Sequence, residues 1–85
     1  MMFYVYILKS DTNTELYIGC TNNLQRRVEE HNSGSVSSTK KYIPYKLIHY
    51  EAFLNKHDAF AREQYLKSGW GKKFLKKNLY HYFHN

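Results

Sequence analysis

Two segments near the amino terminus, residues 3–8 and 15–20, alternate their side chains with a period of two. This alternation is typical of strands that bury one face. Between them lies Ser-Asp-Thr-Asn-Thr, a run of turn formers, so we expect the two strands to form a hairpin. Because opposite residues of a hairpin share a face, a turn centred near Thr12 would bring Tyr6 close to Tyr17. The pattern therefore predicts two phenols on one face of a sheet, next to Gly19.

The rest of the chain predicts one more strand and three helices. Thr21, Asn22 and Asn23 offer N-caps for the first helix, and Asn55 is a suitable N-cap for the second. Trp70, Phe74 and Leu75 indicate the apolar face of the last helix. We expect the first helix over residues 23–31 and the third strand over residues 45–52. We expect the second helix over residues 56–68 and the last helix over residues 70–83. This ββαβα order, followed by a C-terminal helix, indicates a single α+β domain of 85 residues.

Three polar residues fall on or beside the inward sides of the predicted helices. Arg27 and His31 lie beside the stripe that Leu24 and Val28 define, and Glu63 lies on the inward arc of the second helix. A buried charge is costly unless it is paired, so each needs an explanation. Arg27 could extend to the edge of its stripe. Glu63 could form a salt bridge with Arg27 or with a neighbouring lysine.

The composition narrows the class of partner. The net charge is +6 and the pI is about 9.5, which favours nucleic acid first and an anionic membrane second. A basic protein with no specific anionic partner is the simpler alternative. A single cysteine excludes an internal disulfide and fits a reducing compartment, so we expect a cytoplasmic protein. No apolar run approaches the ~20 residues that span a bilayer, and we expect no membrane insertion.

Lysines gather in two places that could contact phosphate. Residues 33–41 predict a mobile loop, or a solvated connector, that ends in Lys40 and Lys41. The last helix carries lysines that could bind nucleic acid, lie on a membrane or form a solvated outer face: Lys72, Lys73, Lys76 and Lys77. Searches for a phosphate-binding glycine loop, paired zinc cysteines or a Ser or Cys nucleophile motif find nothing.

An ordered set of residues resembles the GIY-YIG nuclease family, especially its small standalone members. The set comprises Tyr4-Val5-Tyr6, Tyr17-Ile18-Gly19, then Arg27, His31 and Glu63. The first motif departs from Gly-Ile-Tyr, so Tyr6 carries over and Tyr4 receives no role. The resemblance covers nearly the whole chain. It implies a three-stranded antiparallel sheet flanked by helices, in agreement with the predicted element order.

The resemblance also implies a chemistry, the metal-dependent hydrolysis of DNA. Glu63 would hold a single Mg²⁺ or Mn²⁺, for which carboxylate oxygen is a suitable ligand. Arg27 would contact the scissile phosphate through its planar fork, and His31 would steady the phosphate or assist a proton transfer. We favour Tyr17 as the general base and Tyr6 as a hydrogen-bonding partner of the attacking water. The reverse assignment stays open, as does a hydroxide supplied by the metal.

Two functions compete at this point. The first is an endonuclease with little sequence specificity, acting on branched, damaged or single-stranded DNA. The second is a nucleic-acid-binding module that keeps the fold but has little or no turnover. A membrane-surface protein is a third reading, but it leaves the ordered set unexplained. Selectivity would have to come from the lysines or from a partner protein, because 85 residues leave no room for a second domain.

Overall fold

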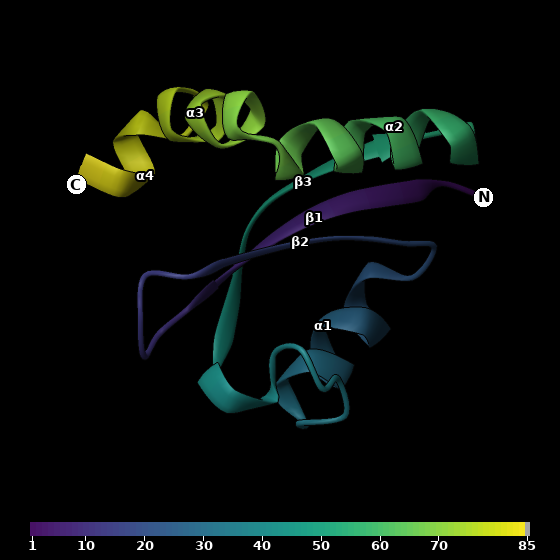
Figure 1. The fold of residues 1–85 in the computed structure, drawn as a ribbon. Coiled ribbons are helices and arrows are strands. Elements are labelled where there is room, and N and C mark those ends of the chain that lie inside the picture. Colours follow the sequence, from purple (N-terminus) through teal and green to yellow (C-terminus); the bar gives the residue numbers. More distant parts are fainter. Residues whose placement is uncertain (85) are drawn as a thin grey trace.

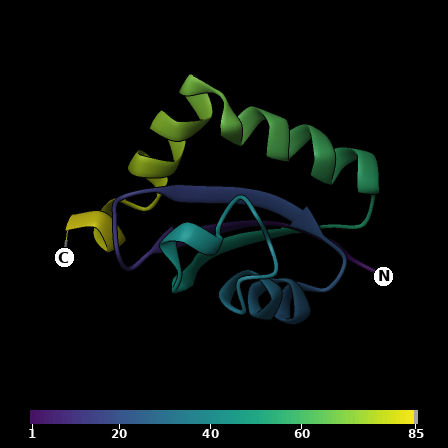
Figure 2. The same cartoon turned by 60° about the horizontal axis from the view of Figure 1, so that its bottom comes forward.

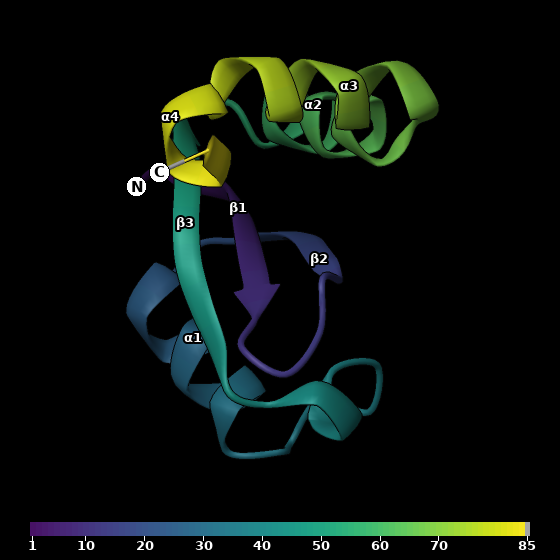
Figure 3. The ribbon, with the colours of Figure 1, turned by 90° about the vertical axis from the view of Figure 1, so that its left-hand side faces the viewer.

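A three-stranded antiparallel sheet forms the middle layer of the computed structural model, which describes residues 1–84 (Figure 1). The strands are β1 (Phe3–Ser10), β2 (Leu16–Thr21) and β3 (Tyr45–Phe53). Their order in the sheet is β2-β1-β3, so β1 is central and pairs antiparallel with both neighbours. Figure 3, viewed from the left-hand side of Figure 1, shows the sheet between α2 and α3 above it and α1 below it. The predicted α+β class and antiparallel sheet are confirmed.

The hairpin of β1 and β2 has the register that the alternation predicts. Tyr6 lies opposite Gly19, and Leu8 lies opposite Tyr17. These four residues share a face, because opposite residues of an antiparallel pair point to the same side. The Tyr6 and Tyr17 ring centroids are 6.2 Å apart. The predicted proximity of the two phenols is therefore confirmed.

Helices α2 (Lys56–Lys67) and α3 (Gly69–Asn78) cover one face of the sheet, as Figure 2 shows from a second direction. The N-cap Asn55 accepts a hydrogen bond from the backbone N–H of His57, which begins α2 where the sequence predicts. The core between these helices and the sheet contains six buried apolar residues: Val5, Ile7, Ile18, Ala59, Leu66 and Leu75.

Helix α1 (Leu24–Asn32) covers the opposite face. Its N-cap Asn23 accepts a hydrogen bond from the backbone N–H of Arg26. At its other end, the Asn32 side chain accepts a bond from Tyr45 N at 2.7 Å and donates one to Tyr45 O at 3.0 Å. This double contact fixes the last turn of α1 against β3. The neighbouring residue, His31, is held there with its side chain fully buried.

The C-terminal segment differs from its prediction in two ways. The expected single helix over 70–83 is two helices, α3 and α4 (Tyr80–His84), with Leu79 between them outside helical geometry at φ −104° and ψ 32°. The inward face is also different, because Trp70 is 74% exposed whereas Gly71 is buried. A Cβ on Gly71 would lie only 2.8 Å from the Leu66 carbonyl carbon, so α3 approaches α2 through its glycine rather than its tryptophan. None of the helices in residues 1–84 is both long and apolar enough to cross a membrane.

The segment between α1 and β3 is more ordered than a solvated connector. Thr39 is fully buried, and a short 3-10 helix follows it at Lys40–Tyr42. The Ser10 hydroxyl donates a 2.6 Å hydrogen bond to the Tyr42 carbonyl, which ties this helix to the end of β1. The expectation of a solvated connector is wrong at Thr39. A polar side chain is buried when partners are available, and Thr39 has one in α1.

Candidate active site

The Tyr6 hydroxyl is the centre of a buried hydrogen-bond cluster. Tyr6 is 1% exposed, and its oxygen lies 2.9 Å from His31 Nε2. Arg27 Nε donates to the same oxygen at 3.4 Å. Residues from the central strand and from α1 therefore meet at one phenol.

His31 continues this cluster into the loop. Its Nδ1 lies 2.8 Å from the Thr39 hydroxyl oxygen, which lies 3.4 Å from the Val36 carbonyl. Arginine can only donate, so the Tyr6 oxygen accepts from Arg27. One consistent assignment follows: Tyr6 donates to Nε2, protonated Nδ1 donates to Thr39, and Thr39 donates to Val36. In this assignment His31 is neutral and its Nε2 is the acceptor for the Tyr6 proton.

Burial favours the uncharged forms of the Tyr6 phenol and the His31 imidazole. Desolvation raises the pKa of Tyr6 to about 12, although the hydrogen bond from Arg27 acts in the opposite direction. Burial, together with the charge of Arg27, lowers the pKa of His31 from its ordinary value. Both shifts favour the uncharged forms at neutral pH. A phenolate at Tyr6 would cost about 7 kcal/mol at pH 7.

Arg27 and Tyr17 lie at the surface of the same cluster. Arg27 Nη1 forms a 3.0 Å ion pair with Glu30, and the two side chains are 34% and 40% exposed. The hydrogen bonds to Tyr6 and Glu30 raise the pKa of Arg27, so it is a permanent cation. The half-buried Tyr17 ring packs against the His31 ring with centroids 4.7 Å apart. The structure therefore brings Tyr6, Tyr17, Arg27 and His31 together, as the sequence predicts.

Gly19 leaves room for the Tyr6 phenol at the edge of the sheet. A Cβ at this position would overlap the hydroxyl end of the Tyr6 ring and would lie 2.9 Å from its Cε1 atom. Real Cβ atoms do not approach other atoms this closely, so a side chain here would displace the ring. The glycine of the Tyr-Ile-Gly motif is required by a close approach rather than by its backbone torsions.

Glu63 approaches from the other face of the sheet, on α2. Its side chain is 12% exposed, and its carboxylate forms a 3.0 Å ion pair with Lys67, one turn later. The salt bridge to a neighbouring lysine is therefore confirmed. After burial, the Glu63 charge is the next cause that raises the pKa of Cys20 in β2, and it also contributes to the raised pKa of Tyr6. Glu63 is thus on the β2 side of α2, within electrostatic reach of the Tyr6 hydroxyl.

The donor set around Glu63 suits magnesium with few protein ligands. Within residues 1–84, no group of three or more His, Cys, Asp or Glu side chains could hold a metal ion. Magnesium, however, retains several waters and needs only one or two carboxylates when substrate phosphate is present. The 48% exposed Lys67 is a flexible partner that a stronger cation can displace. A single hard carboxylate in this position fits the group that the resemblance implies.

The predicted nucleic-acid-binding lysines divide between different surfaces. Lys40 and Lys41 directly follow Thr39 on the α1 side and are exposed. Lys72 and Lys76 line a cavity next to β2. Lys73 lies over the Trp70 ring, 5.2 Å from its centroid, and Lys77 belongs to an aromatic cavity between α3 and α4. The four lysines of α3 therefore have different neighbours, two of them at β2 and two beside aromatic side chains.

Comparison with known proteins identifies the family. The model of the GIY-YIG catalytic domain matches residues 2–78. The chain belongs to the GIY-YIG family. GIY-YIG domains are nuclease domains that generally use divalent metal ions, so the class of substrate is nucleic acid.

The relatives of this GIY-YIG chain are small proteins of similar length. A UPF0213 protein of Pediococcus pentosaceus is 46% identical over 80 residues, which covers 89% of this chain and 83% of the relative. A UPF0213 protein of Clostridium perfringens is 46% identical over 67 residues, covering 78% and 71%. The solution NMR structure of a UPF0213 protein of Bacillus halodurans superimposes with a TM-score of 0.57 at 32% identity, covering 91% and 84%.

Two residues of this GIY-YIG site are not among the residues that the sequence analysis identifies. Thr39 lies among serines and threonines of the same polarity, and no local signal distinguishes it. Glu30 lies on the outer side of the stripe that Leu24 and Val28 define, and it reaches Arg27 at i,i+3 spacing. That spacing is the signal that could have identified the pair.

Proposed function

We propose that this GIY-YIG protein is an endonuclease that hydrolyses phosphodiester bonds in DNA, with a single Mg²⁺ or Mn²⁺ and little sequence specificity. The observation that carries the proposal is the convergence on the Tyr6 hydroxyl. His31 Nε2 lies 2.9 Å from it, Arg27 donates to it, and the Glu63 charge acts on it from the other face. A tyrosine that only packs in the core does not require a permanent cation at its hydroxyl.

Glu63 would hold the metal, with water and substrate phosphate completing the shell. When bound, a divalent ion would neutralise charge on the phosphate and lower the pKa of coordinated water. The near-complete burial of the Glu63 side chain would keep its carboxylate fixed on the β2 side of α2. A fixed carboxylate needs little reorganisation when the ion binds.

Arg27 would bind the scissile phosphate. Its guanidinium can give two parallel hydrogen bonds to phosphate oxygens. The present partner, Glu30, is 40% exposed, and an exposed ion pair is worth only about 0–1 kcal/mol. Arg27 can therefore exchange Glu30 for phosphate at little cost while its Nε remains at Tyr6.

Tyr17 is the better general base of the two tyrosines. It is half-buried, whereas Tyr6 is 1% exposed and its pKa is raised to about 12. An ordinary phenol must lose about three pKa units, ~4 kcal/mol, to ionise at neutral pH, and a nearby cation typically supplies one to three units. Tyr6 would orient the attacking water after a rearrangement that exposes its buried hydroxyl, and His31 would accept the Tyr6 hydrogen bond rather than contact phosphate. A fully buried His31 cannot reach the substrate without rearrangement.

The expected substrates follow from how lysine recognises nucleic acid. Phosphate contacts give affinity that falls with salt but no direct reading of bases. We infer weak sequence preference and selection by the shape of branched, damaged or single-stranded DNA, helped by a partner protein if strict selection is needed. The single free cysteine fits a cytoplasmic site of action.

A nucleic-acid-binding module with little or no turnover is the second candidate. The favouring observation is that the cluster is closed: His31 and Tyr6 are both buried, and Glu63 is paired with Lys67. Such a protein would use Arg27 and the lysines for binding alone.

A cleavage assay distinguishes the two candidates. Wild type and the variants Tyr17→Phe, Arg27→Ala and Glu63→Ala are incubated with duplex, branched and single-stranded DNA, with magnesium and with chelator. The nuclease is supported if wild type cuts only with magnesium, and if Glu63→Ala binds but does not cut. If all four proteins bind and none cuts with magnesium or manganese, the module is the function.

A further inference from the structure

The four lysines of α3 form two pairs that are about 100° apart around the helix and have different neighbours. Lys72 and Lys76 are four residues apart and face the same way. They line a cavity of about 190 Å³ together with residues of the hairpin turn and β2: Thr14, Glu15, Leu16 and Ile18. This pair therefore lies along the outer strand of the sheet, since β2 is an edge strand.

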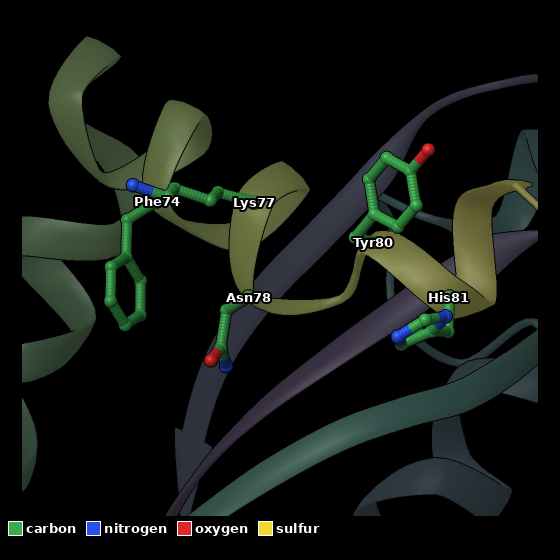
Figure 4. Close-up of a pocket in the computed structure, with 5 residues that line it drawn as sticks. All are labelled: Phe74, Lys77, Asn78, Tyr80 and His81. Atoms are coloured by element: carbon green, nitrogen blue, oxygen red, sulfur yellow. The ribbon is translucent and has the colours of Figure 1, made fainter.

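Lys73 and Lys77 belong to a different surface. Lys73 lies over Trp70, and Lys77 lines a cavity of about 500 Å³ with Phe74, Asn78, Tyr80 and His81. Figure 4 shows the Phe74 ring on one side of this cavity and the Tyr80 and His81 rings on the other. Phe74 also lies under Arg62, which pairs with Glu51 of β3. The second pair thus lies beside aromatic side chains of α3 and α4, and neither of its lysines lines the cavity next to β2.

The edge strand joins the first pair to the candidate active site. Ile18 lines the lysine cavity, and it stands between Tyr17 and Gly19 in the chain. Successive residues of a strand point to opposite faces, about 3.3 Å apart along its axis. Tyr17 therefore faces α1 while Ile18 faces α3, and the two surfaces meet at the free edge of β2. A strand of nucleic acid that passes over this edge would contact both.

We propose that Lys72 and Lys76 bind the sugar-phosphate backbone of the substrate beside the scissile phosphate, and that Lys73 and Lys77 do not take part. The ligand is a nucleic-acid backbone, because two ammonium groups on one helix face are point charges that recognise phosphate without reading bases. This inference rests on the proposed function, since it takes the β2 edge as the place of cleavage.

Glu15 provides a separate test of whether phosphate binds at the lysine pair. It lines the same cavity as the lysine pair and opposes their charge. If phosphate lies there, removing the Glu15 charge strengthens binding. If the cavity is simply a structural gap, the same change has no effect on binding.

The test measures DNA binding in chelator, where the nuclease cannot turn over. Fluorescence anisotropy with a labelled DNA duplex is recorded over a range of salt concentrations for wild type, Lys72→Ala/Lys76→Ala and the matched control Lys73→Ala/Lys77→Ala. Both double variants lose the same charge from the same helix. We expect the first to bind at least about tenfold more weakly, with a log–log salt slope smaller by about two. The control should lose less than about threefold, and Glu15→Gln should bind more tightly than wild type.

The inference is overturned if the two double variants weaken binding equally, because general charge would then suffice. It is also overturned if neither changes binding or if Glu15→Gln has no effect. Failure of the proposed function gives a different result. In that case Lys72→Ala/Lys76→Ala still binds DNA more weakly than Lys73→Ala/Lys77→Ala, but wild type does not cut DNA with magnesium. Circular dichroism of each exposed-lysine variant confirms that the fold is kept.

Discussion

Gly19 lies against the hydroxyl end of the Tyr6 ring, so that no side chain fits between them. The two residues are directly opposite in the β1–β2 pairing. The phenol consequently reaches the edge of the sheet while staying 1% exposed. This relationship explains why the Tyr-Ile-Gly motif ends in glycine, since any Cβ would move the hydroxyl away from His31 and Arg27.

Replacement of Gly19 by alanine should therefore damage the site more than the addition of one methyl group suggests. We expect Gly19→Ala to lower the free energy of unfolding by about 1–3 kcal/mol, the usual cost of overpacking, and to abolish most of the cleavage. Gly69→Ala is the control, because a Cβ there meets nothing within 4 Å. Urea denaturation and the cleavage assay measure both effects. Equal behaviour of the two variants would contradict the close-approach argument.

Thr39 should be needed to hold His31 in the tautomer that accepts from Tyr6. Thr39→Val keeps the shape but leaves the buried Nδ1 without a partner, so we expect a loss of about 1–3 kcal/mol in stability. Thr39→Ser should restore most of it. Ser38→Ala in the same loop is exposed and should stay within about 0.5 kcal/mol of wild type. An NMR measurement of the His31 ring nitrogens would show the changed tautomer in Thr39→Val, and an unchanged tautomer would refute the role.

Folding should weaken in acid because of His31. Burial lowers the folded-state pKa of His31 below its ordinary 6.5, so the unfolded chain binds the proton more readily. The stability is fully present above pH 6.5 and is lost as the pH falls from there through the folded-state pKa. Urea denaturation at pH 7.5 and pH 5.5 should show a smaller loss for His31→Gln than for wild type. An equal loss in both proteins would assign the pH dependence to other groups.

The contact between α2 and α3 should depend on Gly71. A Cβ there would meet backbone atoms of Tyr65 and Leu66, which cannot move aside as a side chain can. We expect Gly71→Ala to destabilise by about 1–3 kcal/mol, although alanine favours helix by about 1 kcal/mol over glycine. Gly69→Ala, at the start of the same helix, again serves as the control. A neutral Gly71→Ala would mean that the two helices can separate without cost.

The parts of the fold that follow from local patterns could be predicted from the sequence. The alternation in β1 and β2 gave the hairpin register and hence the approach of Tyr6 and Tyr17. The cap Asn55 gave the start of α2, and the polar run over residues 21–23 gave the start of α1 to within about one residue. These features depend on neighbouring residues, whose spacing is visible in the chain.

The parts that depend on distant contacts could not be predicted. Thr39 is buried because the loop returns to His31, eight residues earlier, and its sequence neighbours have the same polarity. In α3, apolar spacing favoured Trp70 and Phe74, but α2 accepts only a glycine at the closest point. Packing against another element therefore selected the face of the helix, against the hydrophobic pattern.

The dependence of cleavage on magnesium, compared between wild type and Glu63→Gln, tests the central claim most directly. Glutamine keeps the shape of Glu63 and removes its charge, and binding of DNA in calcium serves as the control for folding and affinity. We predict that wild-type single-turnover cleavage rises with magnesium and saturates, while Glu63→Gln is at least about 100-fold slower at the same magnesium and binds DNA as well as wild type. Wild type that never cuts, or a Glu63→Gln variant with an unchanged magnesium dependence, would contradict the account.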